Sequence, residues 1–138
     1  MSEPRAASEP ARGIVVAHGG LAEGLVDAVR QIAGVTPEEL VGVPNRGVGF
    51  EDLCSRTREA LAPNRNVIFT DLPSGSCHLA AMIVVREVPE IPVVTGVNLP
   101  MLLDFVFNRG LGFDELVPRL SEKAQGAIGG NRHAPPRP

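Results

Sequence analysis

Two polar side chains follow apolar runs at points where the chain turns, and their types suit proton or group transfer. His18 comes directly after the run 14–17 and is followed by two glycines. Asp71 comes directly after a second run, 67–70, and precedes a turn rich in Pro, Ser and Gly. In a parallel sheet the turns that follow the strands gather at one edge, where ligands bind. We therefore expect His18 and Asp71 to meet at such an edge.

A carboxylate beside an imidazole has a definite chemical use. It accepts the proton of Nδ1, fixes the tautomer, leaves Nε2 free as a nucleophile and stabilises positive charge on the ring. The turn after Asp71 opens a helical pattern, and the amides and hydroxyls at a helix N-terminus bind anions. This combination predicts a phosphoryl acceptor on nitrogen. The predicted catalytic residues are His18 and Asp71, and the predicted phosphate-binding residues are Gly19, Ser74, Gly75 and Ser76.

Each of these residues also has a more ordinary use. A histidine at a strand end is usually structural or solvated, and an aspartate before Pro and Gly is commonly a turn residue or a helix cap. Ser76 taken alone is more typical of a cap. We expect His78 to be at the surface or partly buried, assign no role to His133, and expect Cys77 to pack, although a helix N-terminus would stabilise its thiolate. Only the joint placement of imidazole and carboxylate favours the functional interpretation.

Other kinds of site lack their defining parts. A Ser-His-Asp hydrolase of the α/β type needs a Gly-x-Ser-x-Gly turn, which is absent. The dinucleotide fingerprint and the P-loop are absent too, and the glycine loop at 47–49 is only a weak substitute. The two cysteines, Cys54 and Cys77, share no CxxC or Cys/His spacing. We expect no disulfide framework, no metal and no cofactor.

Composition limits the class of protein and its partners. The chain has 138 residues, 43% of them hydrophobic, which suits one domain with a two- or three-layer core. A net charge of −3, the lack of Lys or Arg runs and the absence of Trp and Tyr argue against nucleic-acid binding. The longest apolar stretches reach about half of the roughly 20 residues that a membrane span needs. We expect a cytoplasmic protein that does not insert into membranes.

Both ends of the chain differ from its middle. Residues 1–12 and 129–138 are rich in Pro, Ala, Ser and Arg without any period, and residues 1–12 lack the apolar core of a signal peptide. We predict two disordered tails and one domain over residues 13–128.

Four short runs rich in Val, Ile and Phe, apolar on both faces, predict buried parallel strands. They cover residues 14–17, 40–43, 67–70 and 92–95. A segment with helical spacing follows each run, so the predicted fold is a doubly wound α/β sheet with helices on both faces. The strand order 2-1-3-4 opens a crevice between strands 1 and 3, at the ends that carry His18 and Asp71.

Apolar residues at helical spacing mark the helices. The stripes are Leu21, Leu25, Ala28, Val29 and Ile32 in the first, Phe50, Leu53, Cys54, Thr57 and Leu61 in the second, Leu79, Met82 and Ile83 with Arg86 in the third, and Leu99, Leu102, Leu103, Val106 and Phe107 in the fourth. Asn98 is expected to cap the fourth helix, whose stripe should face inward. In the last segment, Pro118 leaves open whether the helix begins there or at Asp114. Residues 124–128 fit either a helix or an extended piece.

Four segments carry a resemblance to a known family. They are IVVAHG at 14–19, VIFTDL with the turn SGS at 67–76, VTGVNLPML at 94–102 and FDEL at 113–116. In their order and spacing, over roughly residues 13–128, the chain resembles the enzyme IIA domain of the mannose family of the bacterial phosphoenolpyruvate-dependent sugar phosphotransferase system. The segment GVNLPML is the most distinctive part.

The resemblance implies a phosphocarrier. His18 matches the residue that takes a phosphoryl group from the phosphohistidine of the carrier protein HPr and hands it to an enzyme IIB partner. Asp71 matches the carboxylate that orients this histidine, and Ser76 matches a hydroxyl near the phosphoryl group. Family members are typically homodimers that exchange a C-terminal strand, a role that residues 124–128 would fill. Transfer between two imidazoles needs positioning and amide donors, and no metal is obviously required.

The chain also departs from the family pattern. Members usually read Asp-x-x-Gly-Gly-Ser-Pro, whereas here Ser74 replaces the first Gly, Cys77 replaces the Pro, and Leu79 stands where Asn is common. No enzyme IIB domain is present in the sequence. A second hypothesis therefore stays open, namely a regulatory module that binds partners according to its phosphorylation state or has lost phosphorylation.

Overall fold

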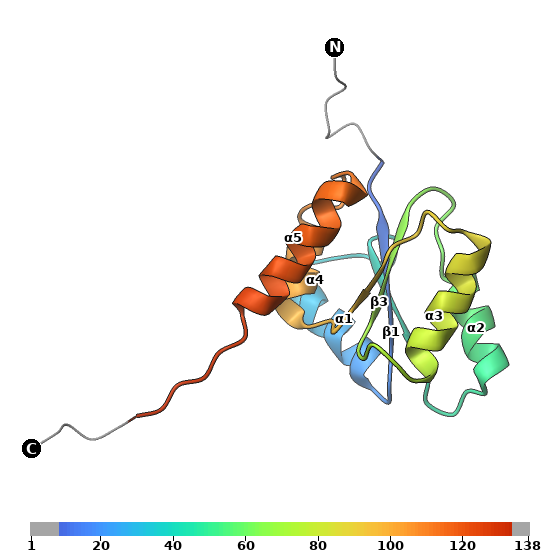
Figure 1. The fold of residues 1–138 in the computed structure, drawn as a ribbon, viewed down its shortest axis with the longest axis horizontal. Helices are drawn as coiled ribbons and strands as arrows, with labels where there is room; N and C mark the ends of the chain where they lie inside the picture. Colours follow the sequence, from blue (N-terminus) through green and yellow to red (C-terminus); the bar gives the residue numbers. More distant parts are fainter. Residues whose placement is uncertain (1–8, 134–138) are drawn as a thin grey trace, which may run out of the picture.

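Strands and helices alternate along the chain, as the sequence predicts. A computed structural model describes residues 9–133. In chain order the elements are β1 (Arg12–Ala17), α1 (Leu21–Ala33), β2 (Leu40–Pro44), α2 (Phe50–Glu59), β3 (Asn66–Thr70), α3 (Ser76–Glu87), β4 (Val93–Thr95), α4 (Leu99–Val106) and α5 (Phe113–Gly126) (Figure 1).

The four strands form one parallel sheet in the order β2-β1-β3-β4. Val15 at the centre of β1 pairs with Gly42 on one side and with Phe69 on the other. The chain moves outward from β1 to β2 and then in the opposite direction to β3 and β4, so the crossover direction reverses between β1 and β3. The predicted fold class and strand order are therefore confirmed, and the crevice falls where it was expected.

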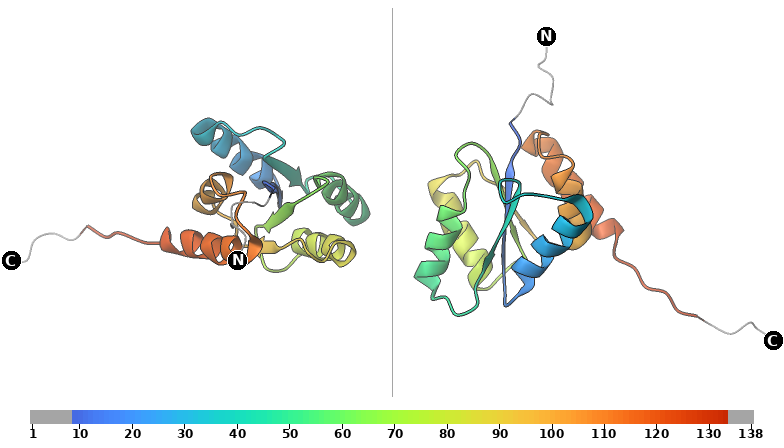
Figure 2. Two further views of the ribbon diagram at one scale, coloured as in Figure 1. Left: turned by 90° about the horizontal axis from the view of Figure 1, so that it is seen from above. Right: turned by 180° about the vertical axis from the view of Figure 1, so that it is seen from behind.

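Helices cover both faces of this sheet. α1, α4 and α5 lie on one face, while α2 and α3 lie on the other, and both views in Figure 2 show the same layers. Alternate residues of β1 enter the two cores: Val15 and Ala17 face the first set of helices, and Ile14 and Val16 face the second. A strand buried on both sides needs apolar residues at every position, which explains the unbroken run in the sequence.

Three of the helices bury a different face from the one that their apolar stripe predicts. In α1 the buried residues are Ala22, Val26 and Val29, while Leu21 and Ile32 at the ends of the stripe are exposed. In the fourth stripe Leu102 is buried, but Phe107 lies beyond the end of α4 and is 73% exposed, so the expectation that it faces inward is wrong.

Small residues form the buried face of α3. Cys77, Ala80, Ala81 and Val84 pack against the sheet and α2, whereas Leu79 and Met82 from the predicted stripe are exposed. Small side chains let the helix axis approach the sheet closely, so the larger residues are left facing outward. Exposed apolar groups consequently accumulate near the turn that begins this helix.

α5 begins at Phe113 and runs through Pro118 to Gly126, so a start at Pro118 is wrong. Pro118 costs the helix interior roughly 3 kcal/mol. Leu116 and Leu120 are both fully buried, and each contributes about 1.5–3 kcal/mol, which offsets this cost. Because the helix continues to Gly126, the extended alternative is wrong for residues 124–126, and residues 9–133 contain no fifth strand.

The folded domain begins before residue 13. Arg12 already belongs to β1, and Ala11 is fully buried with its amide bonded to the carbonyl of Arg109 at 3.0 Å. Residues 11 and 12 are thus part of the fold and not of the tail expected over residues 1–12, while residues 1–8 and 134–138 lie outside the described part. Among the described residues, no helix combines the length and apolar character that crossing a bilayer requires.

Candidate functional site

His18 occupies the turn between β1 and α1, at the carboxyl edge of the sheet (the lower edge in Figure 1). The next residue, Gly19, adopts a φ of 58°, a left-handed conformation that glycine takes without strain. Its amide donates a hydrogen bond to Oδ1 of Asn45 at 2.9 Å, and the Asn45 amide donates to the carbonyl of Ala17 at 3.3 Å. The loop after β2 therefore holds this turn in place.

Asp71 follows β3 and lies directly against His18. Its Oδ2 accepts hydrogen bonds from the His18 backbone amide at 3.0 Å and from ring Nδ1 at 2.9 Å. Its Oδ1 accepts from the Leu72 amide at 3.1 Å. A carboxylate only accepts, so Nδ1 carries the proton and Nε2 keeps its lone pair. The predicted meeting of these residues across the crevice is confirmed.

The two side chains differ in their contact with solvent. The Asp71 side chain is 11% exposed, whereas that of His18 is 41% exposed. Burial by itself raises the pKa of Asp71, but the hydrogen bonds from the His18 amide and ring, together with the charge of the ring, hold that pKa below its ordinary value. The carboxylate is therefore ionised at neutral pH, and it favours positive charge on the half-exposed ring of His18.

The N-terminus of α3 lies beside Nε2 of His18. Gly75, the cap residue, has φ 91° and ψ −177°, a combination that essentially only glycine adopts. A Cβ at this position would lie 3.7 Å from Nε2 of His18. The first bond into the helix is that of the Leu79 amide to the Gly75 carbonyl, so the amides of the preceding turn have no partner within the helix. Free amides at a helix N-terminus are donors of the kind that bind anions, and these lie next to Nε2.

The other predicted phosphate-binding residues have less direct contact with His18. Ser76 starts α3 and is partly buried, while Ser74 is exposed and no side chain caps the helix. The amide of Gly19 already donates to Asn45, and a phosphate-binding role for Gly19 stays a prediction.

The remaining histidines and the nearby thiol have structural surroundings. His78 is partly buried with Nδ1 3.1 Å from Oγ1 of Thr70, and His133 is exposed beyond α5. Burial raises the pKa of the Cys77 thiol to about 11, so it is protonated at neutral pH despite its place at a helix N-terminus. The interpretation of Cys77 as a packing residue is thereby supported.

Two residues on the loop after β2 were missed by the sequence analysis. Asn45 holds the turn through its bond to the Gly19 amide. The guanidinium of Arg46 lies close to Gly20, because a Cβ built on Gly20 would be 3.0 Å from Nη2 of Arg46. Among residues 9–133, Arg46 forms no ion pair. Their position directly after a strand was the available signal, because β2 ends at the same edge as β1 and β3.

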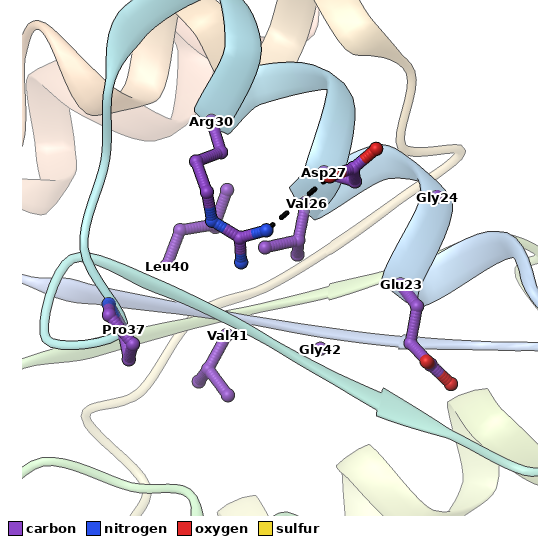
Figure 3. Close-up of a pocket in the computed structure, with 9 residues that line it drawn as sticks. All are labelled: Glu23, Gly24, Val26, Asp27, Arg30, Pro37, Leu40, Val41 and Gly42. Atoms are coloured by element: carbon purple, nitrogen blue, oxygen red, sulfur yellow. Dashed lines mark hydrogen bonds and ion pairs between the residues drawn. The ribbon is translucent and has the colours of Figure 1, made fainter.

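A separate cavity lies away from this edge. It has a volume of about 510 Å³ and lies between α1 and β2, beside the ion pair of Asp27 and Arg30 at 3.4 Å (Figure 3). None of the predicted site residues lines it. The candidate site is therefore the crevice around His18 and not this cavity.

Comparison with protein families decides which family the chain represents. The model of the EIIA-man family, described as the PTS system fructose IIA component, matches residues 13–120. The chain belongs to the EIIA-man family. It is thus a IIA component of the phosphotransferase system (PTS). No curated protein matches the sequence significantly.

Solved structures similar to this EIIA-man protein have the same fold. The PTS component EIIA from Streptococcus agalactiae is 26% identical, with a TM-score of 0.79 over 86% of this chain and 95% of that chain. The mannose/sorbose specific IIA subunit from Enterococcus faecalis is 21% identical, with a TM-score of 0.78 over 94% and 100%. The IIA protein associated with the fucose utilization operon of Streptococcus pneumoniae is 22% identical, with a TM-score of 0.70 over 89% and 95%.

Proposed function

We propose that this EIIA-man protein is a phosphocarrier that accepts a phosphoryl group on Nε2 of His18 from phosphorylated HPr and passes it to an enzyme IIB partner. The observation that carries the proposal is the 2.9 Å contact between Nδ1 of His18 and Asp71, which leaves Nε2 free beside the N-terminus of α3. Membership in the PTS IIA family supports the identity of both partners.

Phosphoryl transfer from phosphorylated HPr to His18 needs no further reactant. A bond forms between Nε2 of His18 and phosphorus while the bond between phosphorus and the donor imidazole breaks, and the donor nitrogen keeps the electron pair. Asp71 stabilises the positive charge that appears on the His18 ring, and the amides of α3 face the phosphoryl oxygens. Positioning and fixed charges are the main requirements of such a transfer.

The surface around His18 supports protein partners. Four apolar side chains, each 38–52% exposed, begin helices or follow strands at the same edge of the sheet, namely Leu21, Phe50, Leu72 and Leu79. Exposed apolar groups gathered on one face are typical of protein interfaces. A small-molecule donor would have no need of them.

We include a homodimer and a cytoplasmic location in this proposal. Phe107 and Ile128 are 73% and 76% exposed on the α4 and α5 side of the domain, away from the predicted site, and burial of such side chains favours association. Sedimentation of the purified chain tests the dimer directly, and a monomeric mass at micromolar concentration would contradict it.

A regulatory role in place of transport is the second candidate. It is favoured by the departures around the anion-binding turn: Ser74 is exposed without capping α3, and Leu79 exposes an apolar side chain where the family commonly has Asn. Such a module would keep the fold and present this surface to a partner. Folded protein that takes up no phosphoryl group would distinguish this module from the phosphocarrier.

The experiment that separates these candidates uses purified enzyme I, HPr and labelled phosphoenolpyruvate. We expect label on the chain that is lost in acid and stable in alkali, as for a phosphoramidate, and that requires HPr. Absence of label on protein with a cooperative unfolding transition would instead favour the regulatory module.

We predict that Gly75→Ala slows phosphorylation by at least about tenfold, because a methyl group would stand 3.7 Å from Nε2 and displace the incoming phosphorus. The unfavourable backbone conformation should also cost about 1–3 kcal/mol of stability. Gly34→Ala is the matched control, since Gly34 also has a positive φ, of 69°, but ends α1 far from His18. It should lose stability and keep the rate; equal rates for wild type and Gly75→Ala would contradict the placement of α3.

We predict that Arg46→Ala slows phosphorylation about two- to fivefold, because an exposed cation contributes about 0.2–1 kcal/mol to binding a phosphoryl dianion. Arg46→Lys should keep most of the rate, and high salt should reduce the difference between wild type and Arg46→Ala. Arg30→Ala, another exposed arginine beside the separate cavity, should have no effect on the rate (Figure 3). Stopped-flow transfer from phosphorylated HPr measures these rates, and identical values for Ala and wild type at low salt would rule out the contribution.

A further inference from the structure

Three different ligand types meet beneath the exposed edge of His18. A ring nitrogen of His18, a carboxylate oxygen of Asp71 and Sγ of Cys77 all lie within 4.8 Å of one another. We propose that these residues bind a divalent transition-metal ion of the Zn²⁺ type, and that this ion and the phosphoryl group exclude each other at His18. The exclusion rests on the phosphocarrier function proposed above, whereas metal binding does not.

The donor set suits such an ion. Zn²⁺ takes nitrogen and oxygen donors at about 2.0–2.2 Å and thiolate sulfur at about 2.3 Å, so tetrahedral donors lie about 3.3–3.7 Å apart. The observed separations, at most 4.8 Å and 2.9 Å between Nδ1 and Oδ2, lie around these values. Imidazole with thiolate selects Zn²⁺ and similar ions over Mg²⁺ or Ca²⁺, which prefer oxygen.

The ligands come from well-held positions. Asp71 is held by hydrogen bonds from two backbone amides, those of His18 and Leu72, and Cys77 lies fully buried in the first turn of α3. His18 is the exposed member, so an ion would enter from its side and keep a fourth position open to water.

The ion and the phosphoryl group exclude each other because they need the proton of the His18 ring on opposite nitrogens. Nδ1 faces Asp71 at 2.9 Å, so an ion shared between them would replace the proton that Nδ1 carries. The neutral ring then holds its proton on Nε2, which loses the lone pair needed to attack phosphorus. In the phosphorylated ring Nδ1 keeps its proton bonded to Asp71, and the ion has no lone pair to bind.

Metal binding must also displace the thiol proton. A Cys side chain binds such an ion as the thiolate, so the ion has to release a proton from sulfur. Proton release should therefore accompany titration with the metal in weakly buffered solution.

Cobalt(II) serves as the spectroscopic probe of binding to the unphosphorylated protein. We expect a thiolate-to-cobalt charge-transfer band in the near ultraviolet for wild type, removal of the band by equimolar Zn²⁺, and loss of the band in Cys77→Ala. Cys54→Ala is the matched control because Cys54 is also a buried thiol in the same core but does not belong to the cluster, and it should keep the band. A band that persists in Cys77→Ala, or no band in wild type, would overturn the metal site.

Phosphorylation in the presence of Zn²⁺ tests the exclusion. With prephosphorylated HPr as donor, we expect Zn²⁺ at a concentration that saturates the cobalt site to slow wild type and Cys54→Ala at least about tenfold, and Cys77→Ala much less. Equal inhibition of all three would overturn the exclusion. Failure of every variant to accept phosphate without metal would instead contradict the phosphocarrier function, while the cobalt spectra would still decide the metal site.

A folded Cys77 variant is needed for both tests. Ala suits the first turn of a helix and should preserve a cooperative unfolding transition. If it does not, Cys77→Ser keeps the size of the side chain while removing the sulfur, and loss of the cobalt band in that variant carries the same meaning.

Discussion

His18→Ala protein incorporates no phosphoryl group from phosphoenolpyruvate, enzyme I and HPr, while wild type is labelled to about one group per chain. This is the largest effect we expect, because the substitution removes the atom to which phosphorus bonds. The ring is 41% exposed and its only described partner is Asp71, so its loss should leave the fold intact. Unfolding in urea verifies that both proteins are folded before the labels are compared.

His133→Ala is the control for this experiment. It removes an exposed histidine from the segment after α5 and should be labelled like wild type. Label that remains in His18→Ala and disappears in another histidine variant would place the phosphoryl group elsewhere and contradict the assignment.

Asp71→Asn should accept the phosphoryl group about 10²- to 10⁴-fold more slowly than wild type, within the range that positioned acid–base groups contribute. The neutral amide no longer stabilises positive charge on the ring, and its nitrogen can donate to Nδ1 and select the wrong tautomer. Its oxygen can still accept from the His18 amide, so the turn should keep its shape. Quenched-flow transfer from phosphorylated HPr measures this rate.

Asp104→Asn is the matched control for Asp71. The Asp104 carboxylate is similarly buried, at 10% exposed, and pairs with Arg119 at 2.9 Å on the α4 and α5 side of the domain. Its loss should lower stability without changing the rate of phosphorylation. A wild-type rate in Asp71→Asn, or an equal reduction in both variants, would mean that Asp71 does not orient His18.

The sheet and the central pair were predictable because their signals are local and strong. Strands such as β1, buried on both faces, read as unbroken apolar runs, and a residue that follows such a run must lie at the carboxyl edge. Strand order then determines which edge residues become neighbours. His18 and Asp71 flank the reversal between β1 and β3, and this is sufficient to bring them together.

Helix faces and loop contacts were less predictable because they depend on tertiary packing. α3 has one stripe of large apolar residues and one of small residues, and its sequence does not tell which is buried; close approach to the sheet selects Ala80 and Ala81. The engagement of the Gly19 amide by Asn45 depends on how the loop after β2 folds back on β1. The same fold-back brings Arg46 to the site.

The position of phosphorus on the His18 ring tests the central claim most directly. Protein labelled with ¹⁵N at histidine is phosphorylated through HPr, and the ring nitrogens are assigned from proton–nitrogen correlation spectra. Since Asp71 holds the proton on Nδ1, the account predicts phosphorus on Nε2 of His18, with Nδ1 still protonated. Phosphorus on Nδ1 of His18, or on a different residue, would contradict it.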